Sequence, residues 1–312
     1  MLPILLKTLP FFALIAVGYA AGRSRFFPPE ATAWLTKFIF YFALSAMLFR
    51  FAANLSLAEI WSTRFVLAYL TGCFAVYALA MVLAFARRIP AEEAAIEAQC
   101  AVIGNTGFLG VPMLVALLGP QAAGPVLMVL TIDLIVFSTI FTLVITGRRG
   151  GRITLGLLRV LVVGLLANPM IVSMGAGLVW SGVGLPVPDV LNDFLLLLGA
   201  AATPGALFAI GASLASKSAE RLAVAGWLSF AKLVLHPAAV AFAALVLFKV
   251  PMPQAGVMIA AAALPVAGNV YILAQHYGVA PQRVSTSILI STAFSILTVT
   301  AVIAWVTAAP DF

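Results

Sequence analysis

Long runs of hydrophobic residues, separated by short polar breaks, dominate this 312-residue chain. Ten such runs are delimited by charged residues and by Pro and Gly turns, and each reaches the roughly 20 residues that an α-helix needs to cross a bilayer. The runs comprise residues 3–22, 31–53, 60–86, 94–118, 122–146, 155–180, 189–215, 221–248, 253–277 and 281–308. The pattern therefore predicts an all-α integral membrane protein with ten transmembrane helices.

The composition supports a membrane protein. Hydrophobic residues make up 64% of the chain and charged residues 9%, whereas soluble chains carry about 25% charged residues. The formal net charge of +7 would suit a nucleic-acid binder, but the basic residues lie in short loops, where they report orientation in the membrane. We therefore expect the lipid bilayer as a partner and no nucleic acid.

The distribution of basic residues predicts the topology. Twelve Lys and Arg residues fall on one side of the ten spans, and Lys232 lies inside the eighth. The other side holds Lys7, Arg50, Arg64 and Lys249. Because basic loops stay in the cytoplasm, we predict a multi-pass protein of the cell (inner or plasma) membrane with both termini extracytoplasmic. We interpret the first run as a span and not as a cleaved signal peptide, because Arg23 and Arg25 follow it.

The two halves of the chain are related by an internal repeat. The longest charged break, at residues 147–154, divides the ten runs five and five. An offset of 159 residues aligns the halves and pairs Pro10 with Pro169, Gly18 with Gly177, and Phe49 with Phe208. Five spans per repeat invert the second copy in the membrane. We therefore predict two inverted five-helix repeats, residues 1–146 and 155–312, joined by a cytoplasmic linker.

The fourth and ninth runs are interrupted at their centres. Residues 104–112 contain three glycines and a proline, and residues 264–271 contain Pro265 and Gly268; both compositions disfavour a continuous helix. Glycine and proline also serve helix packing in membranes, which is the alternative interpretation. Interrupted helices at corresponding places of two repeats are, however, the best pointer in a sequence to a transporter binding site.

The chemistry of such a site favours an anion. Unwinding frees backbone N–H groups at the N-terminus of each half-helix, where the helix dipole also attracts negative charge. The amides of Asn105 and Asn269 can donate to a carboxylate, and Thr106 adds a hydroxyl. The predicted substrate-binding residues are Gly104, Asn105, Thr106, Pro265, Gly268, Asn269 and Tyr271.

Ionisable residues inside the predicted spans form a second set. Asp133 lies in the middle of the fifth run and Lys232 within the eighth, where a charge is costly and is retained mostly for function. We predict that the two side chains face each other and that a proton or cation can replace their mutual interaction. The alternative is that they form a static structural pair. His236, beside Pro237, either joins this relay or binds a freed carbonyl. Glu97 is close to a predicted membrane boundary, where solvation or helix capping accounts for it.

Motifs of enzymes and metal sites are absent from the sequence. It has no His-Glu-x-x-His, no Gly-x-Ser-x-Gly and no phosphate-binding loop ending in Gly-Lys-Ser/Thr. Two histidines supply little metal ligation, and Cys73 and Cys100 both fall within apolar runs. We therefore expect a protein that is not an enzyme and has no metal or cofactor, apart from H⁺ or Na⁺ as a coupling ion.

Five motifs together resemble the auxin efflux carrier family, and in particular its bacterial members. They are Gly104-Asn-Thr-Gly-Phe-Leu-Gly-Val-Pro112, Asn168-Pro169, Pro204-Gly-Ala-Leu-Phe208, Lys232-x4-Pro237 and Pro265-x-Ala-x-Asn269-x-Tyr271. The resemblance covers all ten runs and is most specific in the fourth and ninth. The chain departs from the family pattern at Leu44-Ser45-Ala46, where a proline is expected, and it lacks the long central loop of the plant carriers.

The resemblance implies a fold shared with bile-acid symporters and sodium/proton antiporters, in which the fourth and ninth helices cross at their broken centres. Helices 1, 2, 6 and 7 would form a scaffold and helices 3–5 and 8–10 a moving core. Bacterial relatives are associated with small organic acids such as malonate and malate. We therefore expect an elevator-type secondary transporter of mono- or dicarboxylates, with proton coupling through Asp133.

Two alternatives remain at this stage. A cation/proton antiporter on the same architecture would use Asp133 as its ion site. A non-transporting membrane sensor is the other, and we would expect it to carry a soluble signalling module or long tails. The exact substrate, the direction of transport and the coupling ion stay open, as does a homodimer.

Overall fold

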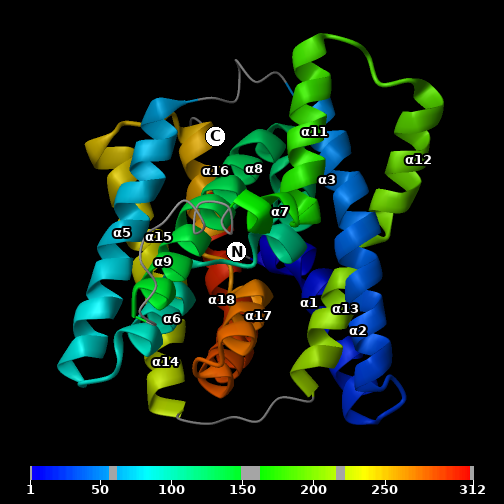
Figure 1. Ribbon diagram of the computed structural model, residues 1–312. Helices are drawn as coiled ribbons and strands as arrows, with labels where there is room; N and C mark the ends of the chain where they lie inside the picture. Colours follow the sequence, from blue (N-terminus) through cyan, green and yellow to red (C-terminus); the bar gives the residue numbers. More distant parts are fainter. Residues whose placement is uncertain (1, 56–61, 149–161, 216–221, 310–312) are drawn as a thin grey trace.

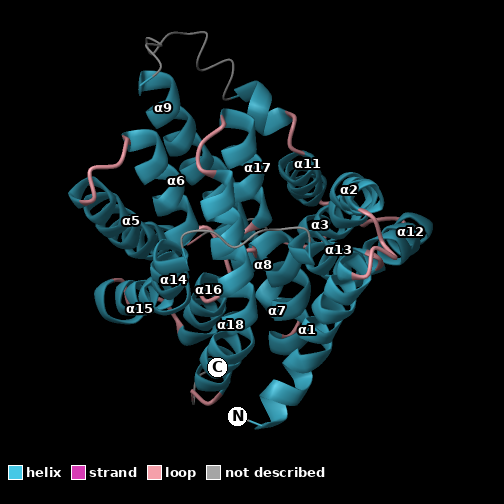
Figure 2. Cartoon of the chain, turned by 90° about the horizontal axis from the view of Figure 1, so that it is seen from below, coloured by secondary structure: helices cyan, strands magenta, loops and turns pink. Residues whose placement is uncertain are grey.

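The computed structural model describes residues 2–55, 62–148, 162–215 and 222–309, and these residues form a bundle of helices (Figures 1 and 2). Within them the only β-type pairing is one isolated bridge. Most of the linker predicted at 147–154, and the start of the predicted sixth span, lie outside the described residues. The described part of the chain therefore agrees with the predicted all-α class.

One group of helices lies on the right of Figure 1 and corresponds to the predicted first, second, sixth and seventh spans. We call these the scaffold helices. They are α1 (Leu2–Arg23), α2 (Pro29–Phe38), α3 (Leu44–Ala53), α11 (Pro169–Val183), α12 (Asp189–Ala200) and α13 (Ala202–Ala215). The wide π-helical turn Ile39–Ala43 joins α2 to α3, so that the two form one long span.

The remaining helices form the second group, which we call the core helices. They are α5 (Thr63–Ala86), α6 (Ala91–Val102), α7 (Val111–Leu118), α8 (Ala123–Ile132), α9 (Ser138–Arg148), α14 (Leu222–Phe230), α15 (His236–Phe242), α16 (Met252–Ala262), α17 (Gly268–Tyr277) and α18 (Pro281–Thr307). Four π-helical turns of the described residues lie within this group, and three of them, Thr106–Gly110, Asp133–Phe137 and Ala231–Leu235, are next to ionisable or interrupted segments; the fourth is Ala243–Leu247. Such turns are rare and often occur at functional sites.

Seven of the described helical segments are long and apolar enough to cross a membrane. They are Leu2–Arg23, Pro29–Ala53, Thr63–Ala86, Pro120–Ile145, Asp189–Ala215, Leu222–Leu247 and Pro281–Thr307. Shorter apolar helices, Thr106–Leu118, Pro169–Val183 and Met252–Ala262, occupy the other three predicted spans. The described residues thus establish an all-helical protein with seven candidate spans, and the ten-span architecture stays a prediction.

The scaffold helices pack through two glycines that occupy equivalent places in the predicted repeats. A Cβ atom at Gly18 of α1 would collide with the backbone of Phe208 in α13, and one at Gly177 of α11 would collide with the backbone of Phe49 in α3. The repeat offset pairs Gly18 with Gly177 and Phe49 with Phe208, so each contact is the counterpart of the other with the two repeats exchanged. This reciprocity supports the predicted repeats, and it explains why glycine stands at both positions.

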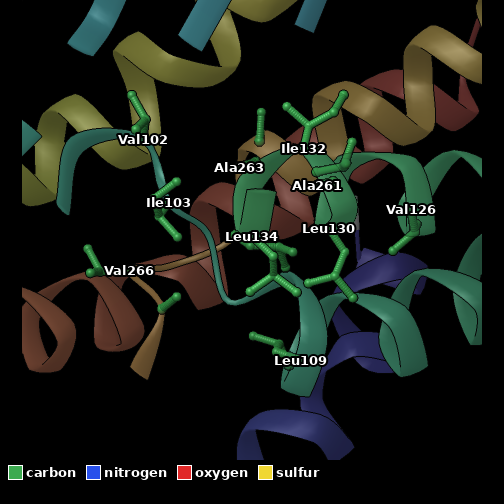
Figure 3. Close-up of a cluster of buried hydrophobic side chains, with 14 of the residues drawn as sticks. Val102, Ile103, Leu109, Val126, Leu130, Ile132, Leu134, Ala261, Ala263 and Val266 are labelled. Atoms are coloured by element: carbon green, nitrogen blue, oxygen red, sulfur yellow. The ribbon is translucent and has the colours of Figure 1, made fainter. Parts of the chain in front are cut away.

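The two interrupted segments of the core cross each other. α6 ends at Val102, the chain then becomes extended, and Gly104 forms an antiparallel bridge with Val266, between α16 and α17. Asn105 N–H donates to Pro265 O at 2.8 Å, and Ala267 N–H donates to Ile103 O at 3.1 Å. Buried apolar side chains surround this crossing (Figure 3). These two backbone pairs satisfy part of the hydrogen-bonding capacity that the broken helices leave open, as a low-dielectric environment demands.

Candidate functional site

A cavity of about 420 Å³ lies against the crossing. Core residues on its wall include Gly104, Asn105, Asp133, Gly268 and Asn269, and the scaffold helices contribute Thr36, Lys37 and Phe40. Asn168, just before α11, also lines it. Both groups of helices therefore bound the same space.

Two further cavities adjoin this one. A cavity of about 160 Å³ shares Asn105 and Asn269 with it and is also lined by Tyr271. A cavity of about 330 Å³ shares Ser138 and Asn168 with it and extends to His276, near the C-terminal end of α17. The hollow region therefore extends away from the crossing in more than one direction.

The structure separates the predicted substrate residues into two sets. Gly104, Asn105, Gly268 and Asn269 line the main cavity and Tyr271 the smaller one. Thr106 and Pro265 line neither cavity. Pro265 instead offers its carbonyl to Asn105 N–H, and the Thr106 hydroxyl donates to the carbonyl of Gly104 at 3.4 Å. These two residues therefore lie outside the cavity lining and form hydrogen bonds with residues that belong to it.

The beginning of α17 presents hydrogen-bond donors to the cavity. Ala267 precedes the helix in an extended conformation, and Gly268 and Asn269 are its first two residues. N–H groups in the first turn have no acceptor within their own helix, and the helix dipole makes this end electropositive. The Oδ1 atom of Asn269 is buried and has no partner among the described residues. The arrangement suits an anion that carries a carboxylate or hydroxyl group.

Asp133 brings a carboxyl group to the same cavity. It begins the π-helical turn Asp133–Phe137 and is 3% exposed. The hydroxyl of Tyr69, on α5, donates to its Oδ1 at 2.9 Å, whereas its Oδ2 has no partner among the described residues. One carboxyl oxygen is thus fixed and the other is available to a proton, a cation or a hydroxyl.

Lys232 is fully buried behind the crossing. Its Nζ lies 3.0 Å from Nδ1 of His236 and donates to the carbonyl of Ala262. That carbonyl is free because α16 ends there and the N–H of Val266, four residues on, bonds to Ser291 instead. His236 also approaches this carbonyl, at 3.1 Å.

Glycine at position 104 makes room for the lysine. A Cβ atom there would lie 3.3 Å from the Lys232 amine and 3.3 Å from the carbonyl oxygen of Ala261. A larger side chain would push the amine away from the crossing. Gly104 therefore contributes to the site by its lack of a side chain.

Asp133 and Lys232 interact electrostatically but form no direct ion pair, because each has other partners. Tyr69 contacts Asp133 and also interacts with Cys73. Cys73 Sγ in turn lies 3.1 Å from His236 Nε2. A continuous polar chain therefore runs from the cavity to the buried lysine, and we call Asp133, Tyr69, Cys73, His236 and Lys232 the crossing cluster.

Tyr69 and Cys73 belong to the crossing cluster but were not among the site residues predicted from the sequence. Both lie in an unbroken apolar helix that carries no local mark of a site. A signal was nevertheless present, because Cys73 and His236 are separated by 163 residues, and Tyr69 and Lys232 by the same interval. This interval is close to the repeat offset and places the two pairs at nearly equivalent positions.

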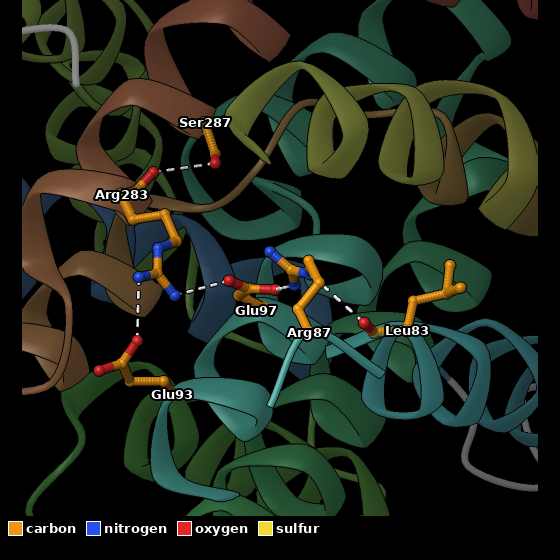
Figure 4. A network of polar contacts seen from close by, with 6 residues as sticks. All are labelled: Leu83, Arg87, Glu93, Glu97, Arg283 and Ser287. Carbon is orange, nitrogen blue, oxygen red and sulfur yellow. Dashed lines mark hydrogen bonds and ion pairs between the residues drawn. The ribbon is translucent and has the colours of Figure 1, made fainter. Parts of the chain in front are cut away.

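A second polar cluster joins the C-terminal end of α5, the first part of α6 up to Glu97, and the N-terminal end of α18 (Figure 4). Glu97 is 1% exposed and accepts from Arg87 and, at 2.6 Å, from Arg283; Arg283 also donates to Glu93 at 2.9 Å. We call these four residues the ion network. The interpretation of Glu97 as a solvated or capping residue is wrong, because its carboxylate is buried between two guanidinium groups.

No group of three His, Cys, Asp or Glu side chains in the described parts of the chain is arranged to hold a metal ion. The polar groups around the cavity are amides, hydroxyls, one carboxyl and one amine. This set is suited to binding and releasing a small polar solute.

Comparisons with known proteins give a consistent result. The family described as "Membrane transport protein" matches residues 3–303. A protein of Rhizobium meliloti (strain 1021) described as "Putative malonate transporter" is 33% identical over 302 residues, which cover 94% of this chain and 92% of that relative. The resemblance to the auxin efflux carriers is thereby confirmed.

Proposed function

The chain belongs to the membrane transport protein family, and we propose that this multi-pass membrane protein is a secondary carrier of small carboxylate anions. The observation that carries the proposal is the cavity of about 420 Å³ in which Asn105 and Asn269 lie beside the N-terminus of α17. Amide donors and a helix N-terminus bind carboxylates without a fixed positive charge. The anion can therefore be released again on the other side.

Malonate is the substrate that we propose first. The relative from Rhizobium meliloti bears its name, and a three-carbon acid is small enough for the cavity. Malate, with an added hydroxyl, is the natural comparison, because the unpartnered Oδ1 of Asn269 can accept from a hydroxyl.

We propose that Asp133 couples transport to protons. An anion in the cavity is repelled by an ionised Asp133, which lines the same wall. A proton on its unpartnered Oδ2 removes this repulsion, so that proton and anion bind together. The crossing cluster gives the proton a route to or from His236 and Lys232. A cation/proton antiporter is the second candidate, because the same Oδ2 could bind a cation directly.

Alternating access would come from movement of the core helices against the scaffold helices. The cavity lies between the two groups, so a displacement of one against the other would carry a bound anion across. The adjoining cavity reaches His276, on the side that the distribution of basic residues predicts to be cytoplasmic. This orientation corresponds to an inward-facing state in a cell membrane.

Uptake of radiolabelled malonate and malate into proteoliposomes, with and without an imposed pH gradient, tests the proposal. We expect saturable uptake that the gradient stimulates, and a loss of about 100-fold for Asn105→Ala, since a charged hydrogen-bonding site loses a donor in a dry environment. Asn54→Ala, at the exposed end of α3, is the matched control and should be unaffected. An absence of acid uptake, together with a response of an internal pH dye to sodium, would establish the antiporter instead.

A further inference from the structure

The scaffold wall of the main cavity carries a lysine that the proposed function has not used. Lys37 lies on α2 and lines the cavity with its neighbour Thr36. Of the described lining residues, Lys37 is the only cation and Asp133 the only acid. The two charged residues come from different groups of helices, Lys37 from the scaffold and Asp133 from the core. Among the described residues Lys37 forms no ion pair.

The observed contact of Lys37 is weak and replaceable. Its Nζ lies 4.4 Å from the centroid of the Trp34 ring, which is 69% exposed. A cation–π contact at an exposed ring is weaker than a charge-assisted hydrogen bond to a carboxylate. The ammonium group is also carried on a flexible four-carbon stem. It can therefore leave the ring for an anion in the cavity without breaking an ion pair.

Asn168 offers a donor on the same wall. Its Oδ1 accepts from Met170 N–H at 3.0 Å and so caps α11. This cap fixes the orientation of the amide, so that its Nδ2 group remains as a donor. Thr36 differs, because its hydroxyl donates to the carbonyl of Thr32 at 2.7 Å. Lys37 and Asn168 are therefore donors on the scaffold side of the cavity, together with the hydroxyl of Tyr41, and Lys37 is the one that carries a charge.

The two sides of the cavity thus present separate sets of groups for negative charge. The core side offers Asn105, Asn269 and the N-terminus of α17, which suffice for one carboxylate. A second carboxylate on the same molecule needs its own compensation, since two negative charges in a region of low dielectric repel strongly. Lys37 supplies a full positive charge for it.

Building on the proposed function, we propose that Lys37, assisted by Asn168, binds the second carboxylate of a dicarboxylate and so selects diacids over monoacids. In this arrangement the substrate bridges the core and scaffold helices. Its first carboxylate contacts the crossing, and its second contacts α2 and the start of α11. Specificity then arises from a charged partner that a monoacid leaves unsatisfied.

Binding of malonate and of monomethyl malonate to the purified protein, measured by calorimetry, tests this role. The two ligands differ by one carboxylate. We expect Lys37→Gln to weaken malonate binding by about tenfold or more and to leave monomethyl malonate within about twofold, so that the preference for the diacid disappears. Lys37→Arg keeps the charge and should keep the preference. Lys7→Gln, an exposed lysine of α1, is the matched control and should change neither affinity.

The outcomes separate this inference from the function on which it rests. If Lys37→Gln weakens both ligands by the same factor, or neither, while Asn105→Ala abolishes binding, the carboxylate site stands and the role of Lys37 is overturned. If the wild-type protein binds neither acid, the proposed function itself fails, and this inference fails with it. Selective loss of malonate in Lys37→Gln supports both.

Discussion

The two buried polar clusters differ in how their charges are paired. In the ion network each carboxylate meets a guanidinium group directly, from Arg87 or Arg283. In the crossing cluster Asp133 and Lys232 have no direct ion pair, and Oδ2 of Asp133 has no partner in the described part of the chain. A cluster of direct ion pairs has one stable arrangement, whereas a partly paired cluster can accept a proton or an anion. We therefore propose that the first cluster stabilises the fold and that the second takes part in transport.

Among the substitutions that test this difference between the two clusters, removal of Glu97 should have the largest effect. Glu97→Ala leaves the 6%-exposed Arg283 and its neighbour Arg87 without their shared carboxylate. Loss of one partner of a buried ion pair costs about 3–5 kcal/mol, so we expect little folded protein in the membrane and a strongly lowered melting temperature in detergent. Glu30→Gln, at the exposed start of α2, is the control. A normal melting temperature for Glu97→Ala would show that the ion network does not stabilise the core.

Asp133→Asn should have the opposite signature, with large loss of function and retained stability. The substitution keeps the shape and the contact with Tyr69 but removes the group that binds a proton. We expect gradient-driven malonate uptake to fall by about 100-fold, or about 2.7 kcal/mol, with an unchanged or raised melting temperature, since a buried ionisable group is removed. Asp193→Asn, exposed on α12, provides the comparison. Persistent stimulation by the pH gradient would exclude Asp133 from coupling.

Tyr69→Phe should have the smallest effect. It removes one hydrogen bond, from the Tyr69 hydroxyl to Asp133 Oδ1, and such a bond contributes about 1 kcal/mol. We expect uptake to fall by about fivefold. Tyr77→Phe is a closely matched control, because Tyr77 lies on the same helix and its buried hydroxyl has no partner among the described residues. Equal effects of the two substitutions would argue that Tyr69 only fills space.

The parts of the fold that could be predicted from the sequence are those set by local composition. Apolar length predicted the helices, and the clustering of glycine with proline around Asn105 and Asn269 predicted the interruptions, because such clusters disfavour a continuous helix. The polar partners across the molecule could not be found in this way. Glu97 and Arg283 are 186 residues apart, and nothing local to either indicates the other.

The predicted contact between Asp133 and Lys232 shows a second limit. The position of each residue within its predicted span placed both near the interrupted segments, but such a position does not specify a partner. Lys232 bonds to the carbonyl that the end of α16 leaves free, and to His236. Backbone groups that lose their helical partners where a helix is broken determine such pairings. Which groups these are changes if the helix ends one residue earlier or later.

The crossing itself is held by peptide groups. Both hydrogen bonds that join the two interrupted segments run from backbone N–H to backbone carbonyl, from Asn105 to Pro265 and from Ala267 to Ile103. Side-chain substitutions do not remove these bonds, apart from a proline at a donor position. During evolution the amides, the lysine and the acid around the cavity can therefore be substituted one at a time, which would change the ligand that the cavity accepts. The backbone hydrogen bonds that form the crossing would be kept throughout.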